Sequence, residues 1–192
     1  MQFVGDFVVD GAICDRLIDL HRTCDRMGLV KRGAMSKGDS AVVDPAKKDS
    51  FDVFVSSIPD DLQDEYGMPG YFAALKGCLD QYTAQHPLLQ RIGTYRMTET
   101  PILQHYRPGG GFKLEHFERS SFATTTRMLV WMTFLNDVTD GGGTRFTYQQ
   151  HTFDAKRGRT LIWPSDFTHT HAGVVSPTQH KYIITGWLNF AE

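Results

Sequence analysis

The stretch KYIITGWLNF, residues 181–190, decides the fold. It is rich in β-branched and aromatic residues, which favour strands. Alternation with a period of two places Lys181, Ile183, Thr185 and Trp187 on one face of such a strand. A lysine that faces an apolar interior needs an anion, because a desolvated ammonium is costly. The alternative is a lysine at a strand end whose ammonium group reaches solvent.

Segments of similar composition fill the chain after Arg91, separated by breaks that contain glycine or proline. This pattern is typical of all-β architecture, either a small barrel or a double-sheet jelly roll. The predicted strands are residues 94–98, 103–106, 113–117, 128–135, 144–148, 151–154, 160–163, 172–175 and 181–190.

Two helices are predicted before this β-rich part. Asp10 can cap the first helix, whose apolar residues recur at helical spacing, and Gly28 can supply the left-handed residue that ends it. The second helix spans residues 69–85, and Pro87 closes it. Residues 31–49 are polar and form either a lid or an ordinary surface connection, and a strand is expected at 51–55.

These elements define the expected fold class: mainly β with N-terminal helices (α+β), a double-stranded β-helix (jelly-roll) core buttressed by two helices. A chain of 192 residues suits a single domain over 1–192. Its helical support would occupy about residues 1–90, and its jelly-roll core about 91–192.

Composition and charge indicate which classes of binding partner and which cell compartment to expect. The net charge of −2 comes from interspersed signs, and no Lys/Arg block indicates nucleic acid or an anionic membrane. The start, MQFVGDFVVDGAICD, reads as neither a signal peptide nor a membrane span. Three cysteines, an odd number, are simplest as reduced thiols, which predicts a cytoplasmic protein.

The chemistry is concentrated in His116-Phe117-Glu118. On a strand, alternation would put the imidazole and the carboxylate on the same face, where both can bind one cation. A third ligand would come from His169 or His171. Two histidines and one carboxylate are typical of iron(II) oxygenases. A zinc or nickel cupin-type hydrolase or isomerase would need a fourth ligand, such as His105 or His151.

Three further motifs accompany these ligands: HYRPGGGF at 105–112, FLNDVTDGGGTRF at 134–146, and the spacing of His171, Lys181 and Trp187. With them, residues 104–190 resemble the 2-oxoglutarate and iron(II) dependent oxygenase superfamily. The resemblance is to its prolyl-4-hydroxylase-like branch, including compact phage and marine bacterial forms.

The resemblance implies a set of site residues. His116, Glu118 and His171 would hold Fe(II), with Glu118 where the branch usually has aspartate. The ten-residue interval to Lys181 favours His171 over His169. Lys181 would pair with the distal carboxylate of 2-oxoglutarate.

Two further residues would line the co-substrate pocket by the same resemblance. Tyr106 resembles a tyrosine of that pocket, and Thr185 resembles a hydroxyl beside the basic residue. Phe134 stands where relatives often have a second tyrosine, so one hydrogen bond to the distal carboxylate would be missing.

The implied activity is hydroxylation of an unactivated C–H bond with O2 and 2-oxoglutarate, release of succinate and CO2, and support from ascorbate. The expected substrate is a prolyl residue in a peptide or protein, and the alternative is a free amino acid or another small metabolite. A different class of function is a barrel that binds metal or peptide without turnover. The sequence leaves the oligomeric state open.

Overall fold

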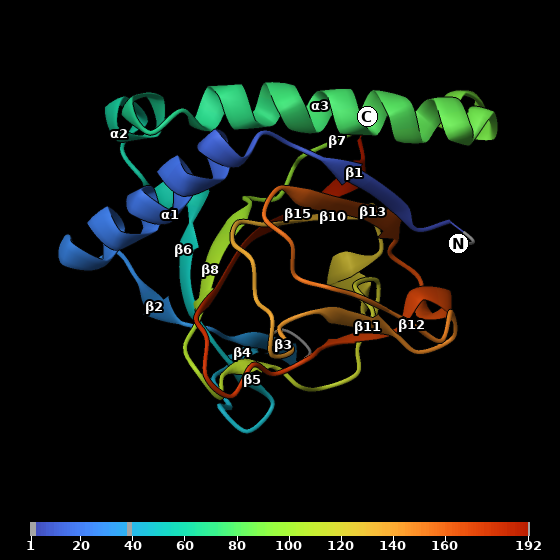
Figure 1. Ribbon diagram of the computed structural model, residues 1–192. Coiled ribbons are helices and arrows are strands. Elements are labelled where there is room, and N and C mark those ends of the chain that lie inside the picture. The colour runs from blue at the N-terminus through green and yellow to red at the C-terminus, as the bar shows by residue number, and fades with distance from the viewer. Residues whose placement is uncertain (1–2, 38–39, 192) are drawn as a thin grey trace.

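The computed structural model describes residues 3–37 and 40–191. A large sheet lies between a layer of helices and a smaller sheet (Figure 1). Helix α3 runs across the outer face of the large sheet, and β11 and β12 lie on its opposite side. The site described below lies between the two sheets.

The large sheet is antiparallel throughout its main path. Its strands, in spatial order, are β1 (Gly5–Val8), β13 (Arg159–Pro164), β10 (Arg127–Phe134), β15 (Lys181–Phe190), β8 (Ile102–Tyr106), β6 (Phe51–Phe54) and β2 (Lys31–Arg32), with β7 (Tyr95–Arg96) paired to β15. The smaller sheet has the order β12 (His151–Phe153), β11 (Thr144–Phe146) and β14 (His171–Gly173). Two short ladders join β3 (Met35–Lys37) to β4 (Ser40–Val42) and β5 (Lys48–Asp49) to β9 (Gly111–Phe112).

The helices are α1 (Gly11–Arg26), α2 (Asp60–Glu65) and α3 (Met68–Gln85), and short 3-10 turns are η1 (Val55–Ser57), η2 (Pro87–Arg91), η3 (Phe122–Thr124) and η4 (Phe167–His169). The predicted ends of α1 are confirmed. The Asp10 carboxylate accepts a hydrogen bond from the Ala12 amide (2.9 Å), and Gly28 adopts φ of 74° beyond the last turn. Asp10 thus satisfies one amide that the helix leaves unpaired.

Strands β10 and β15 separate two apolar clusters. Their outward residues pack with α1 and α3 in an outer core that includes Leu17, Tyr71, Trp131 and Ile184. Their inward residues form an inner core with β11, β12 and β13, made of Val4, Tyr106, Val130, Met132, Phe134, Val138, Phe146, Phe153, Ala155, Leu161, Trp163 and Ile183. The alternation predicted for residues 181–187 therefore turns Lys181 towards the inner core.

The structure also corrects the sequence interpretation. The predicted strand at 113–117 is wrong. Strand β9 ends at Phe112, and in 113–117 only His116 pairs, through an isolated bridge to His171. Strands β1 and β2 had not been predicted, and both join the large sheet. The division near residue 91 remains a prediction, although β1, β2 and β6 come from the part expected to be helical support.

Residues 31–49 contribute β2, the β3–β4 ladder and β5. Residues 38 and 39 of this segment lie outside the described residues, so the lid stays a prediction. All three cysteines are buried and free. Over 3–37 and 40–191, no helix is long and apolar enough to cross a membrane.

We predict that Gly186→Ala lowers the free energy of unfolding by about 1–3 kcal/mol, the usual cost of overpacking a core. A Cβ atom at Gly186 would lie 2.5 Å from Cζ2 of the buried Trp131 indole. The control is Gly77→Ala on the exposed side of α3, where a Cβ meets nothing within 4 Å. That change should stabilise the protein by about 0.5–1 kcal/mol through helix propensity. Urea unfolding of both variants measures the difference, and equal stabilities would contradict the packing described.

Candidate active site

A backbone bridge brings two distant histidines together. The His116 amide donates to the His171 carbonyl (3.0 Å), and the His171 amide donates to the His116 carbonyl (2.9 Å). The next turn is fixed as well, since the amides of Glu118 and Arg119 both donate to the carbonyl of Ser165 (3.1 and 3.0 Å). The backbone therefore sets the positions of all three predicted ligands, even though 113–117 is not a strand.

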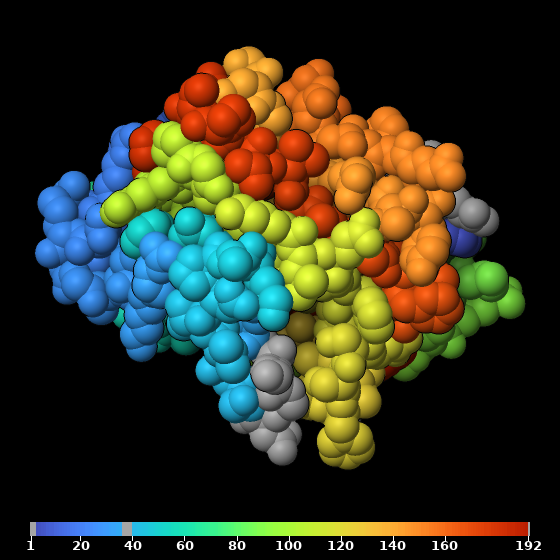
Figure 2. Space-filling model, turned by 90° about the horizontal axis from the view of Figure 1, so that it is seen from below, coloured from blue at the N-terminus to red at the C-terminus, as the bar shows by residue number. Residues whose placement is uncertain are grey.

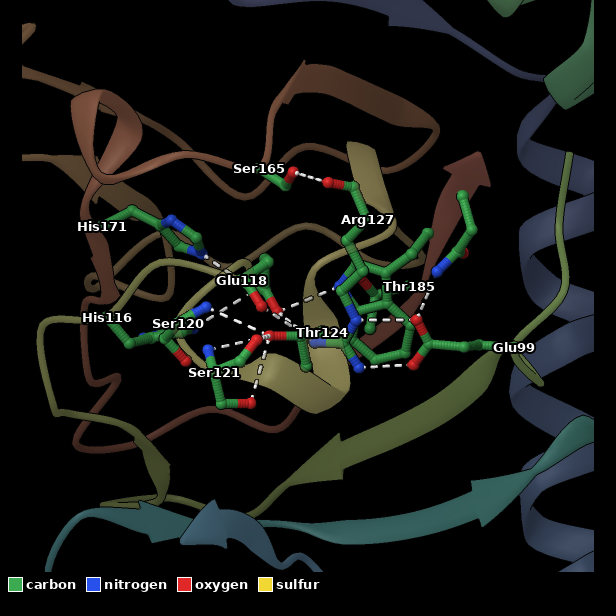
Figure 3. Close-up of polar contacts among 12 residues, drawn as sticks. Glu99, His116, Glu118, Ser120, Ser121, Thr124, Arg127, Ser165, His171 and Thr185 are labelled. Carbon is green, nitrogen blue, oxygen red and sulfur yellow. Dashed lines mark hydrogen bonds and ion pairs between the residues drawn. The ribbon is translucent and has the colours of Figure 1, made fainter. Parts of the chain in front are cut away.

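The three side chains converge on one point. Nε2 of His116 lies 3.5 Å and Nε2 of His171 lies 3.6 Å from Oε1 of Glu118. One ligand atom from each residue lies within 4.8 Å of the other two. Figure 3 shows both imidazoles turned towards the Glu118 carboxylate. His171 is buried, and the side chains of His116 and Glu118 are 18% and 14% exposed, so the cluster is not closed off from solvent.

The hydrogen bonds of the imidazoles define which nitrogens face the cluster. Nδ1 of His116 lies 2.9 Å from the Leu114 carbonyl, and Nδ1 of His171 lies 2.9 Å from the His169 carbonyl. A carbonyl only accepts, so each Nδ1 carries the proton and each Nε2 is left for another partner. Two nitrogens and a carboxylate oxygen that meet in this way require a positive ion or proton between them. A divalent metal cation fits the set, since it would satisfy all three at once.

Electrostatics favour the metal-binding forms of His171 and Glu118. Burial lowers the pKa of His171 to about 4, assisted by the charge of His116, so this imidazole is neutral at pH 7. Burial alone would raise the pKa of Glu118. The hydrogen bond and charge of His116 and the charges of His171 and Arg127 outweigh it and lower that pKa to about 2.

The second oxygen of Glu118 is already engaged. Oε2 accepts a hydrogen bond from Nε1 of Trp187 (2.9 Å) and lies 3.3 Å from Nη1 of Arg127. The guanidinium of Arg127 lies 3.8 Å from the centre of the Trp187 ring and is also paired with Glu99. In Figure 3, Arg127 lies between Glu118 and Glu99. Only Oε1 of Glu118 is thus directed at the imidazoles, which leaves one carboxylate oxygen for a cation.

Sequence reasoning missed Arg127 and Glu99. Arg127 precedes a predicted strand and Glu99 lies in a loop, so neither carries a local motif. Their roles depend on Trp187 and Asn189 of β15, whose side chains bond to Glu118 and to Glu99 (2.9 and 2.8 Å).

The other histidines do not join the cluster. The i, i+2 relation had suggested that His169 and His171 point the same way, which is wrong because His169 lies in η4 and His171 in β14. Nδ1 of His169 lies 3.0 Å from the Thr168 hydroxyl. His105 bonds to His180 (2.8 Å), and His151 packs on Phe153. Within the described ranges no fourth metal-ligating side chain joins the group, which disfavours the zinc or nickel alternative.

A buried lysine, Lys181, begins strand β15. Lys181 is 6% exposed, and its Nζ lies 5.1 and 5.5 Å from the ring centres of Tyr106 and Phe134. No carboxylate of the described residues lies within ion-pair distance of it. Burial accordingly lowers the pKa of Lys181 to about 8. The hydroxyl of Thr185, two positions beyond Ile183 on the same face, donates to the Trp131 carbonyl (2.9 Å).

Residues 101–189 match the family model of the 2OG-Fe(II) oxygenase superfamily. The cluster of two histidines and one glutamate lies within the matched residues, so this part of the chain has both the family pattern and the candidate metal ligands of a 2-oxoglutarate and iron(II) dependent oxygenase.

Solved structures with the same fold include three prolyl hydroxylases. A Pseudomonas putida prolyl-4-hydroxylase has 17% identity and a TM-score of 0.70, over 97% of this chain and 92% of that chain. The Paramecium bursaria Chlorella virus-1 collagen prolyl hydroxylase, solved as a 2OG complex, has 16% identity and a TM-score of 0.67, over 99% and 97%. A Trichoplax adhaerens prolyl hydroxylase, bound to a hypoxia inducible factor peptide fragment, has 15% identity and a TM-score of 0.71, over 97% and 84%.

These likenesses confirm the expected fold, the double-stranded β-helix of prolyl hydroxylases with N-terminal helices. No curated protein matches the sequence significantly.

We predict that His171→Ala weakens Mn(II) binding by more than the roughly 10- to 100-fold typical of losing an outer partner of a ligand. His169→Ala is the matched control, because it retains the carbonyl that accepts from Nδ1 of His171. Its affinity should stay close to that of the unchanged protein. Calorimetric titration of the metal-free proteins measures both, and the reverse order of affinities would make His169 the ligand.

Proposed function

We propose that this protein hydroxylates an unactivated C–H bond of a prolyl residue in a peptide or protein, with O2 and 2-oxoglutarate as co-substrates. Succinate and CO2 would be the accompanying products. One observation carries the proposal: three metal-ligating atoms converge, and the buried Lys181 of the same fold lies among aromatic rings with no carboxylate of the described residues within ion-pair distance.

The proposed metal ligands are His116, Glu118 and His171, and Fe(II) bound there would supply the oxidising chemistry. The chain's own contribution is geometry. The backbone bridge fixes the positions of His116 and His171. Trp187 and Arg127 form hydrogen bonds with Oε2 of Glu118, so this oxygen is already occupied. With only three protein ligands, a metal bound there would keep further positions for co-substrates.

Lys181 is proposed to pair with the distal carboxylate of 2-oxoglutarate. Its neighbours Tyr106 and Phe134 present aromatic rings, which exclude water and so strengthen a charge pair formed there. Phe134 brings no hydroxyl to the pocket. Tyr106 and Thr185 are proposed as wall residues, with their hydroxyl groups bonded to other parts of the protein.

The preference for a prolyl substrate within a longer chain has two supports. The similar solved structures are prolyl hydroxylases, and one of them is bound to a peptide fragment. Apolar side chains are also exposed next to the candidate ligands in sequence: Leu114 (43%), Phe122 (93%) and Phe167 (61%). The loops that carry Phe122 and Phe167 are tied together, because Arg119 pairs with Asp166 (2.9 Å from Nε to Oδ1). Such a rim suits a macromolecular substrate.

We predict that the protein, supplied with Fe(II), 2-oxoglutarate and ascorbate in air, releases succinate, and that proline-containing peptides accelerate this release. Mass spectrometry should find one added oxygen on a prolyl residue. His116→Ala should abolish both signals, whereas the exposed His151→Ala should retain them. Stimulation by free amino acids or other small metabolites instead of peptides would contradict the prolyl assignment. No succinate under any condition would indicate a barrel that binds metal or peptide without turnover.

We predict that 2-oxoglutarate binding to the Mn(II)-loaded protein weakens above pH 8. The pKa of Lys181 is lowered to about 8, so its ammonium form dominates below that pH and declines above it. Only the ammonium form attracts a carboxylate, and the dissociation constant should therefore rise by up to about tenfold per pH unit above 8. Lys181→Met should bind weakly and lose this pH dependence, while the exposed Lys76→Met should keep it. A flat profile in the unchanged protein would contradict the role of Lys181.

We further propose that the protein works in the cytoplasm, which the three buried free cysteines support. Its kinship with the compact phage and marine bacterial forms stays a prediction.

A further inference from the structure

A buried ion pair, formed by Lys48 and Asp52, lies near the strands that carry Tyr106 and Lys181. Nζ of Lys48 lies 2.8 Å from Oδ2 of Asp52, and the two side chains are only 5% and 4% exposed. Nε2 of Gln104 donates to the same carboxylate oxygen (3.2 Å), and the hydroxyl of Tyr106 donates to Oε1 of Gln104 (2.8 Å). A continuous chain of hydrogen bonds thus runs from Lys48 to Tyr106, whose ring faces Lys181.

Strand register explains why these residues meet. Asp52 of β6 pairs with Gln104 of β8, and Tyr106 of β8 pairs with Lys181 of β15. Lys48 reaches them from β5, which pairs with β9. Figure 2 shows the segment of β5 in cyan beside the segment of β9 in yellow-green. Gly33 makes room, because a Cβ there would lie 2.0 Å from Oγ of Ser50 and 3.1 Å from Oδ2 of Asp52.

The donor and the acceptor of each hydrogen bond between Lys48 and Tyr106 follow from the chemistry of these two residues and Asp52. Lys48 can only donate, and the Asp52 carboxylate paired with it can only accept. Gln104 must then turn its NH2 group to Asp52 and its oxygen to Tyr106. Tyr106 has a single proton, which it must donate to that oxygen. Burial, with the charges of Asp52 and Glu118, raises the pKa of Tyr106, so the proton is present at neutral pH.

We propose that Asp52 and Gln104, with Lys48 paired to Asp52, are positioning residues that keep the Tyr106 proton directed away from the co-substrate pocket. This inference rests on the proposed function of Lys181. Because Phe134 also lacks a donor, the distal carboxylate of 2-oxoglutarate receives its charge-assisted contact from Lys181 without help from Tyr106. These hydrogen bonds therefore keep the affinity for 2-oxoglutarate moderate. Removal of the Gln104 side-chain amide would increase it.

The test is calorimetric binding of 2-oxoglutarate to Mn(II)-loaded protein. Gln104→Leu frees the Tyr106 hydroxyl to donate into the pocket, and the dissociation constant should fall about three- to tenfold, the order of one hydrogen bond to a charged group. Gln104→Met offers a more adaptable apolar side chain of similar length if the leucine variant does not fold. Tyr106→Phe, added to either Gln104 variant, should cancel the gain, because the hydroxyl that donates into the pocket is then removed.

Two further variants complete the design. Lys48→Met combined with Asp52→Asn removes the charge that orients the amide without leaving a buried charge alone, and it should also tighten binding. Gln81→Leu on the exposed side of α3 is the control and should change nothing.

Two results would overturn the inference. One is a roughly tenfold or larger weakening by Tyr106→Phe alone, since the hydroxyl would then already serve the ligand. The other is unchanged or weaker binding in a folded Gln104 variant. Failure of the proposed function is a separate result, because unchanged binding by Lys181→Met would reject the pocket itself.

Discussion

The reciprocal hydrogen bonds between His116 and His171 are the constraint on which the site depends. They attach a segment without regular structure to the edge of the small sheet, and so bring together residues far apart in sequence. Side-chain rotation alone could not create this geometry. Because the backbone supplies it, the imidazoles need only one further contact each, from Nδ1 to a carbonyl, to direct Nε2 at Glu118.

The two buried lysines, Lys48 and Lys181, differ in whether the protein itself compensates their charge. Lys48 has a carboxylate partner, and its hydrogen bonds continue into the sheet, so its charge is compensated within the protein. Lys181 lies among aromatic rings with no such partner among the described residues. An uncompensated ammonium in this environment is unfavourable for folding and favourable for binding an anion. The same contrast applies to Glu118, where one oxygen is engaged by Trp187 and Arg127 and the other faces the imidazoles.

The sequence predicted the elements that carry strong periodicity. The alternation at 181–187 correctly placed Lys181 and Ile183 inward, and Asp10 and Gly28 correctly marked the ends of α1. The ligand cluster followed from His116, Glu118 and His171, but for a partly wrong reason, because residues 113–117 form no strand. The strands β1 and β2, at the two edges of the large sheet, were missed, and the two residues of β2 are too few to show alternation. Arg127, Glu99 and Gln104 could not be found locally, because their roles come from strand register.

The position of β15 in the large sheet has a consequence for how the protein folds. It lies between β10 and β8 and pairs residue 183 with residues 134 and 104, so the middle of the sheet is formed by contacts of long sequence separation. Chains dominated by such contacts reach their native state slowly, because loop closure must precede the gain from pairing. During synthesis, β8 and β10 cannot pair with β15 until β15 has emerged from the ribosome, so their inward residues stay uncovered until then.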